Sequence, residues 1–249
     1  MENMTYKKVL YQLVLTVIFI GTMNLNVSGQ QMLNETRKLT RCFALNKETD
    51  VEVVNKYGMI HVETWNKDSV QFEIEVVANA KNQDDIKSLM NNIDFQFINT
   101  NHYIVAKTIF INPTKFLLKD LKNLFGKTNE VNINYKIMVP QHVNIKIENR
   151  FGDMFTPELS GNVNINIAYG KLKATRFDGK LSLKLEFGGA DVNFIDRGDL
   201  IVYFSDLTVN SANYLNTTSS FSDITINQAD VLSINSKQDK LSIIEIKEL

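Results

Sequence analysis

One motif recurs at an almost fixed interval through the second half of this chain of 249 residues. An aromatic residue opens each copy, and the aromatic position returns after 18, 18, 17 and 17 residues. A weaker sixth copy has Gln238 at this position, 17 residues after the last aromatic. A period of this size indicates a solenoid, in which each repeat forms one rung of a stack. The five aromatic residues are Phe151, Tyr169, Phe187, Phe204 and Phe221.

Apolar and polar residues alternate around each aromatic position, as in residues 163–167. This period of two predicts strands with one buried face. The two residues after the aromatic position are Gly, Ser, Asp or Lys, which favour a tight turn. Each unit then reads as strand, tight turn, strand and a looser turn, such as the one at 177–179. We therefore predict an all-β fold, a β-helix-like parallel β-solenoid with 17–18 residues and two short strands per rung.

Stacked rungs place equivalent side chains directly over one another. The aromatic residues are thus expected to form one structural ladder along the stack. Asn193, Asn210 and Asn227 each lie six residues after an aromatic position and are expected to form a second one. Stacked amides satisfy one another's donors and acceptors, so we interpret both ladders as structural.

The repeat also occurs once before the main series, because residues 51–60 match residues 145–154 position by position. We predict one β-solenoid domain over residues 30–249, with first strands and a first rung at 30–65 and regular rungs at 142–249. Residues 66–141 are expected to form an inserted antiparallel β-meander that carries one or two short helices. The helix candidates are 82–92 and 113–125, of which the second packs on the meander or on a partner or membrane surface.

The N-terminus resembles a secretory signal. Lys7 and Lys8 precede a mostly apolar run at 9–20, and residues 27–29 are small enough for a cleavage site. We predict a signal peptide at 1–29 and an exported protein of the periplasm or cell surface; an uncleaved anchor is the alternative. Cys42 is the sole cysteine, so it is expected to be a buried thiol or to bond another chain.

The composition and the motif search exclude several functions. A net charge of −1 lacks the basic excess of nucleic-acid-binding proteins, so no nucleic-acid partner is expected. The three histidines have no zinc-ligand spacing, and no nucleophile or phosphate-binding motif is found. We therefore expect no catalytic residues and no cofactor.

One charged column remains, formed by Asp153, Asp206 and Asp223 two residues after the aromatic position. Asp206 and Asp223 belong to adjacent rungs, which makes them candidates for a calcium site or for an acid/base pair on a polysaccharide. The simpler interpretation is that each Asp caps its own turn.

Residues 55–60 and 149–154, the strand end at 138–140 and the later Tyr/Phe-Gly turns resemble one family of bacterial exported proteins. This is the "putative adhesin" domain family of unknown function, related to the auto-transporter adhesin head (GIN) domain. The resemblance covers residues 40–249 and implies an exported parallel β-solenoid without catalytic residues. The sequence stops in mid-pattern at 246–249, so it is either a fragment or its C-terminal edge strand pairs with another chain.

Three functions follow as hypotheses. The first is a non-enzymatic adhesin or envelope scaffold that binds an unknown protein or glycan of the cell envelope. The second is a carbohydrate-active β-helix enzyme. The third is an accessory or sensor protein of the envelope-stress response.

Overall fold

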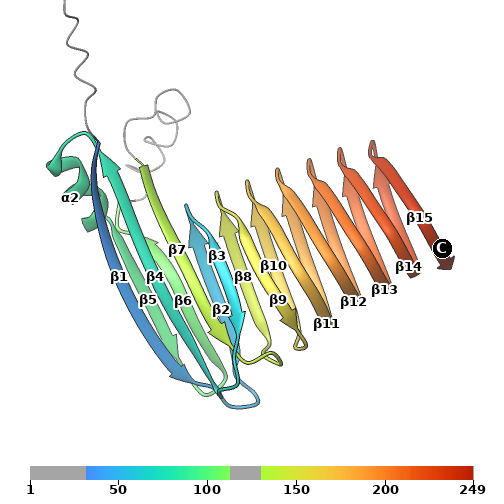
Figure 1. Ribbon diagram of the computed structural model, residues 1–249, viewed down its shortest axis with the longest axis horizontal. Helices are drawn as coiled ribbons and strands as arrows, with labels where there is room; N and C mark the ends of the chain where they lie inside the picture. Colours follow the sequence, from blue (N-terminus) through green and yellow to red (C-terminus); the bar gives the residue numbers. More distant parts are fainter. Residues whose placement is uncertain (1–31, 113–129, 249) are drawn as a thin grey trace, which may run out of the picture. The chain divides into compact units, whose positions relative to one another are not determined.

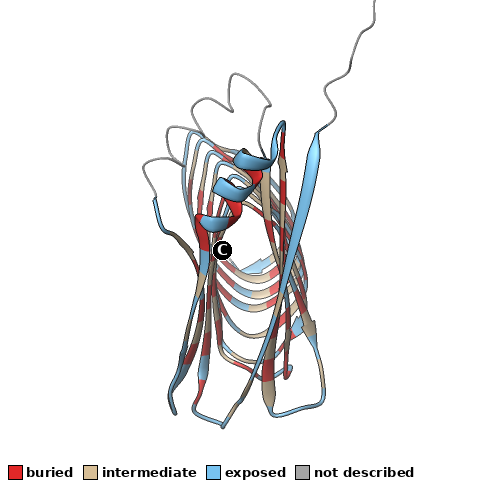
Figure 2. Ribbon diagram, turned by 90° about the vertical axis from the view of Figure 1, so that its left-hand side faces the viewer, coloured by how far each residue is buried: buried red, intermediate tan, exposed pale blue. Residues whose placement is uncertain are grey.

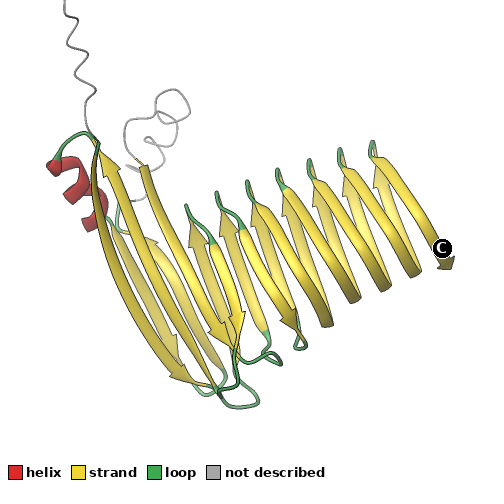
Figure 3. Ribbon diagram, in the orientation of Figure 1, coloured by secondary structure: helices red, strands yellow, loops and turns green. Residues whose placement is uncertain are grey.

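The computed structural model describes residues 32–112 and 130–248. These residues are mostly strand, with one short helix, and their strands stack as a parallel β-solenoid (Figures 1 and 3). The predicted fold class is confirmed. The signal peptide expected at 1–29 and the helix expected at 113–125 both lie entirely outside the described residues. No helix of the described residues is long and apolar enough to cross a membrane.

Each rung contributes to two walls that enclose the core. The first wall contains β3 (Ile60–Thr64), β9 (Met154–Leu159) and the first halves of the later long strands. The second wall contains β2 (Asp50–Lys56), β8 (Ile145–Arg150), β10 (Val163–Ala168) and the second halves of the same long strands. The long strands are β11 (Lys171–Glu186), β12 (Gly189–Tyr203), β13 (Asp206–Ser220) and β14 (Asp223–Lys237), and β15 (Lys240–Glu248) follows them.

The chain passes from the first wall to the second without leaving β conformation in β11–β14. The looser turn expected at 177–179 is a bend inside β11. Paired residues skip the position six after the aromatic in every pair of long strands: Val192 pairs with Val209 and Phe194 with Ser211, while Asn193 is passed over. The strand therefore turns a corner at this position, which lets alternate side chains keep pointing into the core after the bend.

The tight turn at the other end of each rung holds the aromatic residue in a left-handed backbone conformation. The φ angle at this position is 66° at Tyr57 and 50° at Phe204, and it is 57° at Gln238, which takes the place of the aromatic residue in the last turn. This conformation costs a residue with a Cβ about 1–2 kcal/mol. The strain is offset by hydrogen bonds between rungs, such as the one from the Tyr169 N–H to the Glu186 carbonyl oxygen at 3.0 Å.

The residue after the aromatic changes its role along the stack. A Cβ on Gly170 would lie 2.1 Å from the carbonyl oxygen of Gly152, so the early turns require glycine here. Later turns carry a polar side chain that accepts a hydrogen bond from the preceding rung. Ser205 Oγ accepts from the Gly188 N–H at 3.0 Å, and Ser222 Oγ accepts from the Ser205 N–H at 3.2 Å.

The inserted segment is antiparallel, and its strands divide between the two walls. The first wall continues through β7 (Glu130–Val139) and β4 (Ser69–Ala80) to β1 (Leu33–Ala44). The second wall continues through the hairpin of β6 (Tyr103–Phe110) and β5 (Ile93–Asn99).

Helix α2 (Gln83–Asn91) lies at this end of the core and contacts β1, β4 and β5, so it touches both walls (Figure 2). The helix predicted at 82–92 is confirmed. The Asn82 side chain accepts from the Asp85 N–H at 2.8 Å and caps it, and Ile86, Leu89 and Met90 are buried. Arg37 of β1 donates to the Ile93 carbonyl oxygen at 2.7 Å, which joins the two walls.

Buried residues occur along the strands of both walls (Figure 2). Tyr135, Phe72 and Phe177 are the largest that are fully buried. Cys42 is exposed, so the expectation of a buried thiol is wrong. It lies on β1, which has a strand partner on one side only among the described strands, and few of its side chains reach the core.

Candidate functional site

The aromatic ladder lies on the outside of the tight turns. Successive ring centroids from Phe151 to Phe221 are 4.8, 5.1, 5.2 and 5.0 Å apart, and neighbouring planes are within 9° of parallel. Tyr57 extends the ladder at 5.4 Å from Phe151. The exposed fraction of the five residues from Phe151 to Phe221 lies between 40% at Phe151 and 51% at Phe204. Each ring covers the face of the next, so solvent meets ring edges, and the ladder offers few faces on which a ligand could stack.

The asparagine ladder lies at the bend of the first wall. Asn210 Nδ2 donates to Asn193 Oδ1 at 3.2 Å, and Asn227 Nδ2 donates to Asn210 Oδ1 at 3.1 Å. The amides point outward and bridge three rungs. Asn193 and Asn210 also line a hollow of about 770 Å³ on this wall.

The aspartate column lies beside the aromatic ladder on the turn edge. Asp153 Oδ1 accepts from the Lys171 N–H at 2.8 Å, and Asp223 Oδ2 is 3.5 Å from Lys240 Nζ. Calcium takes 6–8 oxygen ligands. The described residues contain no group of three or more His, Cys, Asp or Glu placed to hold a metal. Asp206 and Asp223 alone therefore do not fit a calcium site.

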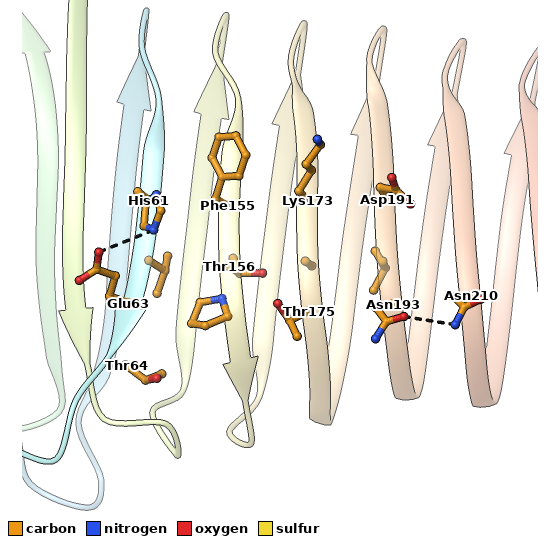
Figure 4. Close-up of a pocket in the computed structure, with 14 residues that line it drawn as sticks. His61, Glu63, Thr64, Phe155, Thr156, Lys173, Thr175, Asp191, Asn193 and Asn210 are labelled. Carbon is orange, nitrogen blue, oxygen red and sulfur yellow. Dashed lines mark hydrogen bonds and ion pairs between the residues drawn. The ribbon is translucent and has the colours of Figure 1, made fainter.

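A trough of about 770 Å³ crosses the outer face of the first wall (Figure 4). Residues of β3, β9, β11, β12 and β13 line it. It opens where β3 and β9 diverge, because these strands pair only at Ile60–Met154 and His61–Phe155. Beyond that point β3 stays with β7 and β9 stays with β11. Pro157 of β9 has no N–H and cannot extend a ladder there.

Two rows of side chains form the banks of the trough, with up to one member of each row per rung (Figure 4). One row lies four residues after the aromatic position, and the other lies six after it, at the bend. The first row is His61, Phe155, Lys173 and Asp191, and the second is Glu63, Pro157, Thr175, Asn193 and Asn210. Both rows run across the strands.

The trough carries charges of both signs, and two of the charged side chains have no ion-pair partner among the described residues. Glu63 lies 3.0 Å from Lys136 Nζ and 3.7 Å from His61 Nε2. Lys173 and Asp191 make no ion pair with another described residue. The His61 and Phe155 rings lie 5.9 Å apart, and the Phe155 ring is seen face-on in Figure 4.

The second wall has a smaller hollow of about 470 Å³. The lysines that line it already form ion pairs with neighbouring carboxylates. Lys146 Nζ lies 2.9 Å from Glu52 and 3.0 Å from Glu148, and these hydrogen bonds raise the pKa of Lys146. Lys180 Nζ lies 2.7 Å from Asp199 and lowers the pKa of that carboxyl. The trough on the first wall, whose Lys173 and Asp191 have no ion-pair partner among the described residues, is therefore the stronger candidate site.

Sequence reasoning singled out Asn193 and Asn210 but missed the rest of the trough. The available signal was the outward position four residues after each aromatic, which changes from His to Phe, Lys and Asp along successive rungs. The divergence of β3 and β9 depends on pairings between distant segments, and no local pattern predicts it.

No protein family and no curated protein matches this chain. Solved structures similar to it include a putative cell adhesion protein from Clostridium sporogenes, with 8% identity over 86% of this chain and 100% of that one and a TM-score of 0.29. A putative adhesin from Parabacteroides merdae has 9% identity over 87% and 96%, with a TM-score of 0.32. A putative lipid binding protein from Parabacteroides distasonis has 11% identity over 87% and 96%, with a TM-score of 0.35. The relation to the GIN domain stays a prediction.

Proposed function

We propose that this protein is a non-enzymatic, adhesin-like binding protein of the cell envelope that holds a glycan in the trough on its first wall. The observation that supports this is the pair of side-chain rows that cross five strands, with an unpaired cation and an unpaired anion among them. Export is inferred from the N-terminal pattern of Lys7, Lys8 and the apolar run at 9–20.

A glycan fits the trough better than an extended peptide does. Peptides bind sheets mainly by adding a strand to a free edge. In the first wall, β11, β12 and β13 are paired on both sides. Recognition along these three strands must therefore use side chains, whereas β3 and β9 leave backbone edges open where they part. Sugar hydroxyls donate and accept hydrogen bonds, and the Thr, Asn, Asp and Lys side chains of the trough offer both functions.

The strand positions of the carboxylates in the trough argue against glycoside hydrolysis. That reaction needs two carboxyl groups about 5 to 9.5 Å apart. Glu63 lies on β3 and Asp191 on β12, which are three strand spacings or about 14 Å apart. Asp206 and Asp223 lie on the exposed turn edge outside the trough, and Asp223 pairs with Lys240.

The test is a glycan array probed with the purified protein, followed by titration of the glycans that bind. The double variant Lys173→Ala/Asp191→Ala should weaken binding by about tenfold or more, since each lost hydrogen bond to a charged group costs about 1.5–3 kcal/mol. The matched control is Lys171→Ala/Asp206→Ala, which removes the same two side-chain types outside the trough.

The control should bind as the wild type does. Binding of no glycan, or equal loss in the two double variants, would contradict the proposal. Cleavage of a bound polysaccharide that disappears in Asp206→Asn would instead support the enzyme hypothesis.

A further inference from the structure

We propose that the glycan is an extended, neutral polysaccharide that crosses the strands with one sugar residue per rung. This inference rests on the proposed function and adds the ligand's shape, charge and register to it.

The rung repeat sets the register. Equivalent ring centroids on the turn edge are 4.8 to 5.4 Å apart in successive rungs. Since β9, β11, β12 and β13 stay paired through the trough, both rows keep this step from β9 to β13. Between β3 and β9 only the first row keeps a similar step, with the His61 and Phe155 ring centroids 5.9 Å apart. An extended chain of equatorially linked pyranose units advances by a closely similar distance per sugar. Such a chain laid along the trough would bring every sugar into the same relation to its rung. A chain that coils, such as an α-1,4-linked glucan, would lose this register after a few units.

Each rung then forms one subsite with its own chemistry. The β9 rung offers Phe155 and Pro157, an aromatic ring beside a pyrrolidine, against which the apolar face of a sugar ring can pack. The β11 rung offers Lys173 and Thr175, and the β12 rung offers Asp191 and Asn193. These side chains can donate to and accept from hydroxyl groups on the two sides of the chain.

The residues at the two ends of the trough set how many rungs it covers. His61 and Glu63 of β3 line one end, and Asn210 of β13 lines the other. The trough therefore spans five rungs, from β3 to β13. A chain of five sugars would fill it.

The charges select against a charged polymer. Lys173 and Asp191 have opposite signs and lie on adjacent rungs, so a uniformly charged chain meets one repulsive contact for each attractive one. Glu63 is already matched by Lys136. A neutral chain is repelled by neither Lys173 nor Asp191.

The experiment is a length series of neutral oligosaccharides titrated into the purified protein by calorimetry. Cello-oligosaccharides and N-acetylated chito-oligosaccharides of two to eight units are the extended probes. Malto-oligosaccharides are the coiled control, and oligogalacturonates and chitosan oligomers are the charged controls. Affinity for at least one extended series should rise with each unit up to five and then level off. The coiled and charged series should bind at least about tenfold more weakly.

Phe155→Leu should lower the affinity for the pentamer by about tenfold, because a leucine keeps bulk but offers no ring face. Tyr103→Leu changes an exposed aromatic residue at the hollow of the second wall and should leave it unchanged. Three results overturn the inference: affinity that does not grow beyond two units, preference for a charged or coiled series, or binding of neither extended series while another glycan binds.

That last result would leave the proposed function standing. Failure of all glycans, on the array and in titration, would instead remove the proposed function itself.

Discussion

The rings of Phe204 and Phe221 stack with their centroids 5.0 Å apart and their planes within 1° of parallel, although both residues have a positive φ, of 50° and 53°. Each of these residues therefore combines a stabilising ring contact with a strained backbone conformation. An aromatic pair of this kind contributes about 0.5–1.5 kcal/mol, and the left-handed backbone costs about 1–2 kcal/mol. The turn keeps its shape because hydrogen bonds between rungs fix it, such as that from the Phe204 N–H to the Ser220 carbonyl oxygen at 3.1 Å.

Substitutions at Phe204 should separate these two effects. Phe204→Ala loses the stacking and keeps the strain, whereas Phe204→Gly loses the stacking and relieves the strain. We expect the alanine variant to be about 1 kcal/mol less stable than the glycine variant, in urea unfolding followed by circular dichroism. Equal stabilities of the two variants would show that the backbone is not strained here.

A second prediction concerns the close approach of successive turns. Gly170→Ala would place a Cβ 2.1 Å from the Gly152 carbonyl oxygen and force the rungs apart. We expect a loss of at least about 2 kcal/mol in the free energy of unfolding. Gly189→Ala is the control, because its Cβ would meet nothing nearer than the Asp206 carbonyl oxygen at 3.6 Å. That variant should be neutral or slightly stabilising. Similar losses in both would contradict the packing argument.

A third prediction concerns Asp239, the last polar residue in the column that follows the aromatic position. Its carboxylate accepts from Ser236 Oγ at 2.6 Å, Ser219 Oγ at 2.7 Å and the N–H groups of Ser222 and Lys237 at 2.8 and 3.2 Å. Burial alone would raise the pKa of Asp239, but these hydrogen bonds outweigh it and the pKa is lowered. Because the pKa is lower in the folded protein than in the unfolded chain, the ionised group stabilises the fold.

That contribution is present above the unfolded pKa of about 3.9 and is lost as the pH falls through the lower, folded value. Asp239→Asn should cost about 1–2 kcal/mol at pH 7 and should unfold with a weaker acid dependence than the wild type between about pH 5 and 2. The check is the free energy of unfolding as a function of pH. An unchanged acid dependence in Asp239→Asn would refute the assignment.

A fourth prediction concerns the end of the core next to α2. Arg37 donates to the Ile93 carbonyl oxygen across the gap between the walls, and its guanidinium carbon lies 5.6 Å from the centre of the Phe95 ring. Arg37→Met should cost about 1 kcal/mol and speed amide hydrogen exchange in β5. Arg41→Met is the matched variant, since within residues 32–112 and 130–248 Arg41 donates only to the carbonyl oxygen of neighbouring Thr40, and it lies over Phe97. It should leave exchange in β5 closer to the wild type.

Much of the fold was predictable because it follows from a periodic sequence pattern or from residues close together in the sequence. The spacing of Phe151, Tyr169 and Phe187 fixes which residues lie over one another once the strands stack in parallel. The short helix was predictable from Asn82 at its start, Asp84 and Asp85 in its first turn and Gln83–Asn91 as a compact amphipathic segment. The left-handed turn residues were not predicted, because an aromatic side chain gives no local preference for positive φ.

The sequence by itself determined the rung, its length and the residues that stack, since these follow from a repeat that every copy obeys. Only the tertiary structure decided that the inserted strands divide between two walls, that Cys42 is exposed and that β3 parts from β9 after His61. These features depend on which of several similar strands pair between separate segments, as β3 does with β7 where Ile60 pairs with Tyr135. Such a choice is made by the free energy of the whole core, and no short stretch of sequence encodes it.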